Sequence, residues 1–450
     1  MNGKERIPGR PEIAAKYIAR TQGSRAAHAK ALKRLPGGIN RNITHFSPYP
    51  LFVAEGQGQY LHDVDGNRYV DMIGNYTSMI FGHAHAETVD AAVQALERGS
   101  GWAAASPMEY DLAEMIGERI PSMKQTRFTS SGTEATMMAI RAARAATGRS
   151  LIAKFEGGYH GQHDYAVVSL APDLVSAGTR HKPEAVAPRG VPVGVRESVI
   201  VLPFNDPDAV QELLAQHAQD LAGVIVEPIM GVAGMIEPQP GFLARLRELT
   251  RQHGIVLIFD EVISFRVRYG GAQELYGVGP DLTTLGKIIG GGLPIGALGG
   301  DPEIMGVFDP TQSNPVMLSG TFHANPVSLA AGVATLRAFD KSTVEALNST
   351  STSLFARMRR LIENSPQPLR LNCVGSLFNL HFTDTPVVDY RSAVLADKEL
   401  LGWLQLALLN RGFLVAPRGL GCLSVPMIEA DLDRFLTALE EALSDVAQDL

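Results

Sequence analysis

The sequence is short of the features that mark secreted, membrane-spanning and nucleic-acid-binding proteins. Its 450 residues hold 2 cysteines, Cys373 and Cys422, too few for a disulfide framework, which favours a reducing compartment. No apolar run reaches the roughly 18 residues that span a bilayer, and the N-terminus lacks the apolar core of a signal peptide. No block of Lys or Arg stands out and the net charge is −7, so nucleic acid and anionic membranes are poor partners. We therefore expect a cytoplasmic protein.

Glycine is the residue that the sequence has in excess. The chain contains 45 glycines among 450 residues, against a usual share of about 7%. Hydrophobic residues make up 45% and charged residues 19%, a globular balance in a chain long enough to fold without disulfides or a structural metal. Glycine lets the backbone approach a ligand or a neighbouring chain closely, so its clusters indicate candidate sites.

The middle of the chain alternates short apolar runs with longer stretches of helical periodicity. A strand is expected at 223–227, a helix around 242–253 and the next strand at 255–262. Asp206 and Pro207 are expected to cap and open a further helix. Near-continuous apolar strands that alternate with helices predict a mainly parallel, doubly wound α/β sheet covered on both faces.

The two ends of the chain are organised differently from the middle. Residues 1–75 predict an N-terminal helix and a hairpin, and residues 329–450 predict a separate α+β domain that ends in an amphipathic helix. We expect residues 76–328 to form the large domain. Within it, the stretch 170–198 has four prolines, three glycines and little periodicity, which predicts a functional or mobile loop.

Three local features point to chemistry when they are taken together. Ser131, Gly132 and Thr133 open a helix whose free N–H groups could bind a phosphate, although a simple cap is the commoner role. Asp260 ends an apolar strand, where a buried carboxylate needs a partner unless it only caps the next loop. Lys287 lies among apolar residues and glycines, which would lower its pKa and favour a nucleophilic amine, although a surface lysine is the plainer alternative. A phosphate anchor, a partner for the ring nitrogen and an amine are the parts that pyridoxal phosphate requires.

These motifs resemble, in order and spacing, those of the class III pyridoxal-phosphate aminotransferases of fold type I. The resemblance runs from about Pro36 to Pro426 and is carried by the segments 131–135, 155–161, 227–228, 259–262, 285–292 and 319–322. It implies a fold type I enzyme with a large doubly wound domain and a smaller α+β domain made from both chain ends. It also implies a homodimer with active sites at the subunit interface.

The resemblance further assigns roles to individual residues. Lys287 would hold pyridoxal 5'-phosphate as a Schiff base and move the proton, Asp260 would pair with the pyridine nitrogen, and Tyr159 would stack on the ring. No metal ligand is expected. The other implied cofactor-binding positions are the phosphate-binding residues Ser131, Gly132 and Thr133, then Thr321 from the neighbouring subunit, and finally His160, Glu227 and Val262.

Within the class, the chain is most similar to the branch of glutamate-1-semialdehyde aminomutases and β-amino-acid aminotransferases. Arg418 matches a second arginine of the β-phenylalanine aminotransferases, and Arg41 aligns with their N-terminal arginine. Guanidinium groups bind carboxylates in bidentate geometry, so two of them suit a β-amino-acid donor and a keto-acid acceptor such as pyruvate or 2-oxoglutarate. A structural salt bridge is the alternative for each arginine.

We therefore expect an aminotransferase that moves an amino group from a carboxylate-bearing amine, a β-amino acid by the resemblance, to an α-keto acid by a ping-pong mechanism. Three alternatives stay open. One is a glutamate-1-semialdehyde aminomutase, which needs no external keto acid, and another is an amino-acid racemase on the same scaffold. The third is a catalytically silent cofactor-binding protein, which would have no need of the lysine, the aspartate and the aromatic residue together.

Overall fold

The computed structural model describes residues 11–365 and 367–447, and its contacts divide the chain into two units. Unit 2 comprises Ala86–Asn348 and the short segment Val387–Val394. Unit 1 comprises the chain up to His85, Ser349–Pro386 and the chain from Leu395. The described parts of the chain nearest its two ends therefore belong to one unit.

The unit boundaries lie further along the chain than the sequence predicts. The sequence predicts them at 75/76 and 328/329, whereas they fall at 85/86 and 348/349, and the chain returns to unit 2 once more at 387–394. The second shift has a packing cause, because helix α14 (Pro326–Ala338) packs against α4 (Ala86–Arg98) and α5 (Pro107–Arg119) of unit 2. A helix that buries its side chains in unit 2 belongs to it, and periodicity alone does not reveal where those side chains go.

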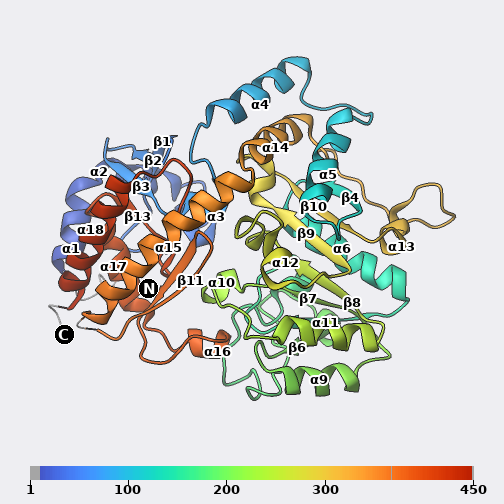
Figure 1. Ribbon diagram of the computed structural model, residues 1–450. Coiled ribbons are helices and arrows are strands. Elements are labelled where there is room, and N and C mark those ends of the chain that lie inside the picture. The colour runs from blue at the N-terminus through green and yellow to red at the C-terminus, as the bar shows by residue number, and fades with distance from the viewer. Residues whose placement is uncertain (1–10, 366, 448–450) are drawn as a thin grey trace. The chain divides into compact units, whose positions relative to one another are not determined.

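Unit 2 is built on a seven-stranded, mainly parallel sheet (Figure 1). The strand order is β4-β10-β9-β8-β7-β5-β6, in which β10 pairs antiparallel with both of its neighbours and the strands from β9 to β6 pair in parallel. The predicted α/β class with a doubly wound sheet is thereby confirmed. The strands are β4 (Gln125–Thr129), β5 (Leu151–Phe155), β6 (Val199–Leu202), β7 (Leu221–Val226), β8 (Val256–Asp260), β9 (Leu282–Gly286) and β10 (Gly296–Gly300).

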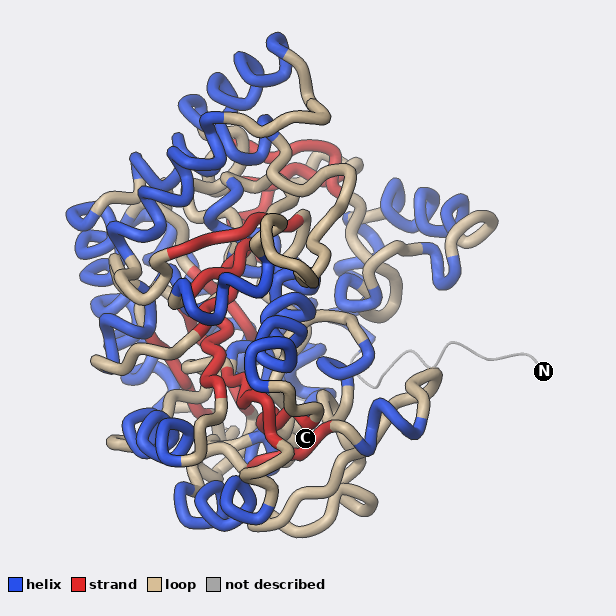
Figure 2. Tube along the Cα trace, turned by 90° about the vertical axis from the view of Figure 1, so that its right-hand side faces the viewer, coloured by secondary structure: helices blue, strands red, loops and turns tan. Residues whose placement is uncertain are grey.

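Alternate side chains of the central strands enter two separate hydrophobic cores. Leu257 and Phe259 of β8 join the core that contains residues of α9 (Pro207–Gln216) and α11 (Phe242–Gln252). Ile258 of the same strand joins the core that contains residues of α6 (Gly132–Thr147). Figure 2 shows strands, in red, with helices on both sides. Since side chains of a strand alternate between faces, a strand that is apolar throughout must be covered twice, as the sequence predicts.

The remaining helices of unit 2 are short. Helix α9 begins as expected, because the Asp206 side chain accepts a hydrogen bond from the Ala209 N–H at 3.1 Å and Pro207 occupies the first turn. The short helices are α7 (Asp164–Val167), α8 (Val193–Glu197), α10 (Gly231–Gly234), α12 (Gly271–Tyr276), α13 (Pro302–Met305) and α16 (Tyr390–Ala393), with single turns η3 (Ser264–Arg266), η4 (Lys287–Gly290) and η5 (Gly306–Phe308).

Unit 1 has the α+β composition that the resemblance implies. Its strands form one sheet of order β1-β2-β3-β13 and one of order β11-β12-β14. The strands are β1 (Val53–Gln57), β2 (Tyr60–Asp63), β3 (Arg68–Asp71), β11 (Arg370–Val374), β12 (Leu377–His381), β13 (Phe413–Leu414) and β14 (Leu420–Cys422). The helices are α1 (Pro11–Arg20), α2 (Gln22–Ala31), α17 (Lys398–Leu409), α18 (Glu429–Ala447) and the short α3 (Gly74–Thr77), with turns η1 (Pro36–Gly38) and η2 (Asn42–Thr44), while α15 (Lys341–Glu363) crosses the unit boundary. Among the described residues, no helix is both long enough and apolar enough to cross a membrane.

Candidate active site

The carboxyl ends of four strands of unit 2 lie around one cavity of about 170 Å³, which we call the lysine cavity. Tyr159 and His160 follow β5, Glu227 follows β7, Asp260 ends β8 and Lys287 follows β9. Ligands of open parallel sheets bind at this edge. Nine residues that the resemblance singled out line the cavity, namely Ser131, Gly132, Thr133, Tyr159, His160, Glu227, Asp260, Val262 and Lys287.

Lys287 owes its position to the end of β9 and the glycine-rich turn after it. Its φ of 52° lies in the left-handed region, which costs free energy for any residue with a side chain. The following turn ends at Gly291, whose φ of 58° glycine adopts without strain. Lys287 is partly buried and lines the cavity, so the plain alternative of a surface lysine does not describe it. The lowered pKa expected from the sequence stays a prediction.

Asp260 is buried and accepts hydrogen bonds at both carboxylate oxygens. Oδ2 lies 2.8 Å from Nδ1 of His160, and Oδ1 accepts from the Thr284 hydroxyl at 3.1 Å and from the Val262 N–H at 3.2 Å. Only 4% of Asp260 is exposed, so these contacts supply the partners that a buried carboxylate needs. The bond to the Val262 N–H also shows that Asp260 caps the following turn, as the alternative interpretation expected.

His160 orients Asp260 in a way that the sequence did not reveal. Burial lowers the pKa of His160 despite the opposing effect of the Asp260 carboxylate, so the imidazole is neutral at physiological pH. A neutral ring that donates from Nδ1 carries its lone pair on Nε2, which is buried and has no protein partner among the described residues. The one signal in the sequence that could have indicated the His160–Asp260 pair is that His160 directly follows Tyr159, a residue that the resemblance assigns to the cofactor site.

The start of α6 supplies backbone N–H groups to the lysine cavity. The Ser131 hydroxyl accepts from the Glu134 N–H at 3.2 Å, so its side chain is a helix cap in addition to any role toward a ligand. Gly161 packs so closely on Thr133 that a Cβ there would lie 2.5 Å from the Thr133 Oγ1. A sixteen-residue helix carries a positive partial charge at this end, which suits a phosphate.

Glu227 is a second buried carboxyl group at the cavity. Its oxygens accept from the N–H groups of Tyr159 at 3.0 Å and Gly231 at 3.3 Å. Burial, with a further contribution from the Asp260 charge, raises the pKa of Glu227 to about 8, so the group holds a proton at neutral pH. The lysine cavity thus contains a carboxyl group that is neutral at neutral pH.

Arg41 and Arg418 belong to unit 1, where both guanidinium groups lie beside the ring of Tyr76. Their Cζ atoms are 5.3 Å and 5.8 Å from the ring centroid, and Arg41 donates to the Asn75 side chain at 2.9 Å. Asn75, Tyr76 and Thr77 have φ of 46°, 55° and 77°, three strained residues in succession. Such strain is concentrated at functional sites, and sequence reasoning missed Tyr76 because no periodic pattern marks it.

Arg41 also lines a cavity of about 370 Å³ in unit 1, which we call the apolar chamber. Its wall is mostly aliphatic and aromatic, and Gln405, 2% exposed, has a buried Oε1 without a protein partner among the described residues. The apolar side chains of the wall are Ile43, Phe46, Leu51, Val53, Leu61, Ile73, Met79 and Leu414.

Thr321 does not line the lysine cavity in the described part of the chain. It lies in unit 2 on an exposed stretch, next to Phe322, of which 67% is exposed. That Thr321 serves the neighbouring subunit stays a prediction.

The doubly wound sheet and the lysine cavity at its carboxyl edge define a fold type I enzyme that uses pyridoxal phosphate. The family model for class-III aminotransferases matches residues 43–443. The chain belongs to this family.

Relatives with two different activities are similar to the chain over nearly its whole length. A glutamate-1-semialdehyde 2,1-aminomutase from Heliobacterium modesticaldum is 42% identical, with 94% of this chain and 96% of the relative covered. An omega-transaminase from Sphaerobacter thermophilus, known from its crystal structure, is 42% identical in sequence to this chain. The two structures match with a TM-score of 0.92 over 95% of this chain and 99% of the transaminase chain. A β-phenylalanine aminotransferase from Variovorax paradoxus is 35% identical with a TM-score of 0.85, covering 95% and 96%.

Pyridoxal 5'-phosphate is the cofactor of this family, and a solved transaminase similar to the chain holds it. The residues of the lysine cavity fit the group. The start of α6 offers N–H groups, Asp260 offers a fixed carboxylate and Lys287 offers an amine. The described residues contain no group of three or more His, Cys, Asp or Glu side chains placed to hold a metal ion.

Proposed function

We propose that the chain is an aminotransferase that takes an amino group from a carboxylate-bearing amine and passes it to an α-keto acid. The observation that carries the proposal is the meeting of Lys287, the Asp260–His160 pair and the start of α6 in one cavity. Bound there, pyridoxal phosphate supplies an electron sink for the carbon–hydrogen bond that breaks.

The chain's own residues would orient the cofactor and move a proton. Asp260, held at both oxygens, presents a fixed negative charge for the ring nitrogen. Nζ of Lys287 would take the proton from the substrate carbon and return a proton later in the same half-reaction. Tyr159, in the cavity wall, would cover one face of the ring and exclude water from it.

The arginines of unit 1 favour carboxylate substrates with an apolar group. Arg41 and Arg418 flank Tyr76 and would bind carboxylates, one for the donor and one for the keto acid. The apolar chamber that Arg41 lines is large enough for an aryl or branched alkyl group. This combination supports a β-amino acid with an apolar side chain as the donor, with pyruvate or 2-oxoglutarate as the acceptor.

We further propose that the enzyme is a cytoplasmic homodimer in which Thr321 contributes to the partner's phosphate site. Val89, Val93 and Leu96 follow one face of α4 and are 43%, 48% and 58% exposed. Such a row of exposed apolar side chains is the kind of surface that another protein chain usually covers. Light scattering of the pure protein should give twice the chain mass.

A glutamate-1-semialdehyde aminomutase is the second candidate, and the names of the similar curated relatives favour it over the main proposal. The aminomutase relative cited above is as similar to this chain as the omega-transaminase is, at 42% identity in both cases. A five-carbon substrate of that kind has no group that would need an apolar chamber, and this is why we place the aminotransferase first.

Acceptor dependence separates the candidates. The holoenzyme is incubated with β-phenylalanine, with and without pyruvate or 2-oxoglutarate, and separately with glutamate 1-semialdehyde alone. We expect keto product from the β-amino acid only when the acceptor is present. Isomerisation of glutamate 1-semialdehyde without acceptor would instead establish the aminomutase. Deuterium uptake at the α carbon of an amino acid without keto product would establish the racemase.

A further inference from the structure

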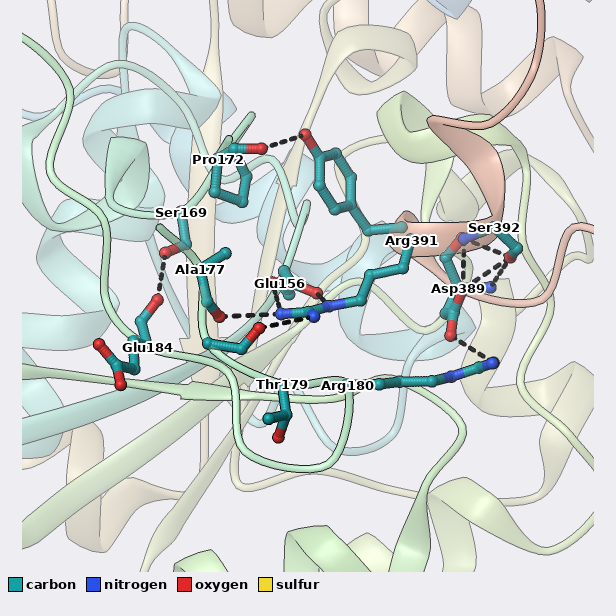
Figure 3. A network of polar contacts seen from close by, with 12 residues as sticks. Glu156, Ser169, Pro172, Ala177, Thr179, Arg180, Glu184, Asp389, Arg391 and Ser392 are labelled. Atoms are coloured by element: carbon teal, nitrogen blue, oxygen red, sulfur yellow. Dashed lines mark hydrogen bonds and ion pairs between the residues drawn. The ribbon is translucent and has the colours of Figure 1, made fainter. Parts of the chain in front are cut away.

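The segment Val387–Val394 joins unit 2 although the chain on both sides of it belongs to unit 1. It contains the single helical turn α16, which Asp389 caps through a reciprocal pair of hydrogen bonds with Ser392. Val387 is buried in the hydrophobic core beside α9 and α11, so the segment is anchored in unit 2. Further polar contacts of the segment, drawn in Figure 3, lead to two loops of unit 2.

Arg391 is the centre of this network. Its guanidinium grips the Glu156 carboxylate in bidentate geometry, with Nε–Oε2 at 2.8 Å and Nη2–Oε1 at 2.9 Å. It also donates to the carbonyl oxygens of Ala177 at 2.8 Å and Gly178 at 2.9 Å. The side chains of Glu156 and Arg391 are only 5% and 15% exposed, so water cannot easily replace either partner.

One side of the network ends on the turn that carries Tyr159. Glu156 is the first residue after β5, and the ring of Tyr390 packs directly on Gly157, where a Cβ would collide with it. Gly157 has a φ of 77°, which favours glycine. Tyr159 follows two residues later and lines the lysine cavity. Arg391 and Tyr390 therefore contact the first two residues of this turn.

The other side of the network ends on the 170–186 part of the long loop. The Tyr390 hydroxyl donates to the Pro172 carbonyl at 3.1 Å, and Arg180 pairs with Asp389 at 2.6 Å. Ser169 closes the loop base, because its carbonyl accepts from the Gly157 N–H and its hydroxyl accepts from the Val186 N–H, both at 2.9 Å. The long loop and the Tyr159 turn are thus fastened to each other and to α16.

We propose that Arg391 is a positioning residue for Tyr159, which rests on the proposed function of Tyr159 as the residue that covers the cofactor ring. Arg391 does not line the lysine cavity and touches no reacting group. Its guanidinium binds Glu156 at the start of the Glu156–Tyr159 turn and also binds the 170–186 loop, so it fixes the position of the turn relative to the loop. We call the bidentate pair of hydrogen bonds from Arg391 to Glu156 the fork. Without the fork, the buried Glu156 carboxylate loses its partner and the turn loses its fixed position.

The test compares Arg391→Met with Arg411→Met as a matched control. Arg411 also makes several bonds, to Glu441 at 3.0 Å, Asp445 at 2.8 Å and the Ala407 carbonyl at 3.0 Å, but it lies in unit 1. The first measurement is trypsin cleavage of the cofactor-free protein after the exposed Arg180 and Arg189. We expect Arg391→Met to speed this cleavage about tenfold and Arg411→Met to leave it unchanged. Equal rates in the two variants would overturn the fastening of the loop.

The second measurement is the visible circular dichroism per bound cofactor, which reports how rigidly the ring is held. We expect Arg391→Met to reduce the signal about twofold or more in the wild-type background and to change it little in a Tyr159→Ala background. A merely structural role predicts equal loss in both backgrounds, and that result would sink the proposal. If Tyr159→Ala by itself leaves the signal and cofactor affinity intact, the proposed role of Tyr159 fails instead.

Two conservative variants keep the test decisive if Arg391→Met does not fold. Arg391→Lys keeps the charge but cannot make the fork, and Glu156→Gln keeps the shape but loses the charge. Both should lie between wild type and Arg391→Met in cleavage rate and in circular dichroism. Wild-type values in both variants would contradict a positioning role for the fork.

Discussion

The lysine cavity of unit 2 and the apolar chamber of unit 1 are built in opposite ways. The lysine cavity is small, at about 170 Å³, and its wall carries buried titratable groups that are each held by named hydrogen bonds. The apolar chamber is about 370 Å³, and its wall is mostly aliphatic and aromatic, with Arg41 and the Asp71–His83 pair as its charged groups and strained backbone at Tyr76. The first is held in shape by hydrogen bonds between its own polar groups, whereas the shape of the second depends mostly on its apolar side chains.

The residues of the two cavities also come from different kinds of position in the sequence. Residues of the lysine cavity come at the ends of strands and in short motifs, because a single ligand must be met from several fixed directions. Residues of the apolar chamber come from loops and strand faces of unit 1, and their common property is only that they are apolar. The residues of the lysine cavity can thus be predicted from motifs, whereas the apolar residues of the apolar chamber cannot.

Removing the amine of the lysine cavity should have the largest effect. Lys287→Ala should abolish the visible absorption of the lysine-bound cofactor and lower turnover by roughly a thousandfold or more. Lys124→Ala, which removes an exposed lysine paired with Asp301, is the control and should behave as wild type. Spectral titration and steady-state rates provide the measurements. Turnover close to wild type in Lys287→Ala would contradict the role of Lys287 in catalysis.

Removing one guanidinium beside Tyr76 should affect carboxylate binding and leave the lysine cavity intact. Because a charge-assisted hydrogen bond pair is lost, Arg418→Ala should raise the KM for keto acid by about tenfold to a hundredfold, with cofactor binding unchanged. Arg245→Ala, which breaks a surface ion pair with Glu248, is the control. An unchanged KM in Arg418→Ala would assign this arginine to a structural role.

Filling the apolar chamber should narrow substrate choice without harming the chemistry. Ile43, which is 40% exposed and lines the chamber, can become Trp without disturbing a buried core. We expect Ile43→Trp to lower kcat/KM for β-phenylalanine about tenfold and to spare β-alanine, since only the aryl group competes for the space. Ile428→Trp, on an exposed site outside the chamber wall, is the control. Equal losses for both donors would show that the chamber does not hold the aryl group.

The smallest predicted effect concerns the pH dependence of stability. The pKa of Glu227 is about 8 in the folded chain against an ordinary value of 4.5, so between these values the folded state holds a proton that the unfolded state releases. This contribution is full below pH 4.5 and is lost as the pH rises toward 8. Urea denaturation of cofactor-free protein at pH 5 and pH 6 should show Glu227→Gln losing less stability than wild type over this interval, by about 1 kcal/mol. A wild-type slope in Glu227→Gln would mean that this carboxyl is ionised.

The sequence predicts the frame of the lysine cavity well because its signals are local. The apolar run that ends at Asp260 predicts β8, and parallel strands bring their carboxyl ends together whatever the loops do. The glycine-rich run after Lys287 indicates close backbone approach, and it contains β10, where Gly296 has no room for a side chain against the Ser131 carbonyl. The antiparallel direction of β10 relative to β9 depends on the geometry of the loop between them, which amino-acid composition does not predict.

Contacts between residues distant in sequence could not be predicted in the same way. The bond between His160 and Asp260 spans one hundred positions, and no periodicity links the two. Tyr76 is flanked by arginines from opposite ends of the chain, and its φ of 55° is not what a tyrosine suggests. The return of Val387–Val394 to unit 2 depends on packing against helices far upstream, which only the folded chain reveals.

The eight-residue return at 387–394 also limits how such a protein can be recombined. A chimera that takes its C-terminal third from a relative would import a foreign partner for Glu156, Gly157 and Pro172 of the recipient. Exchange of the chain ends as a cassette is therefore safe only if 387–394 is kept native or exchanged together with the loops that it fastens.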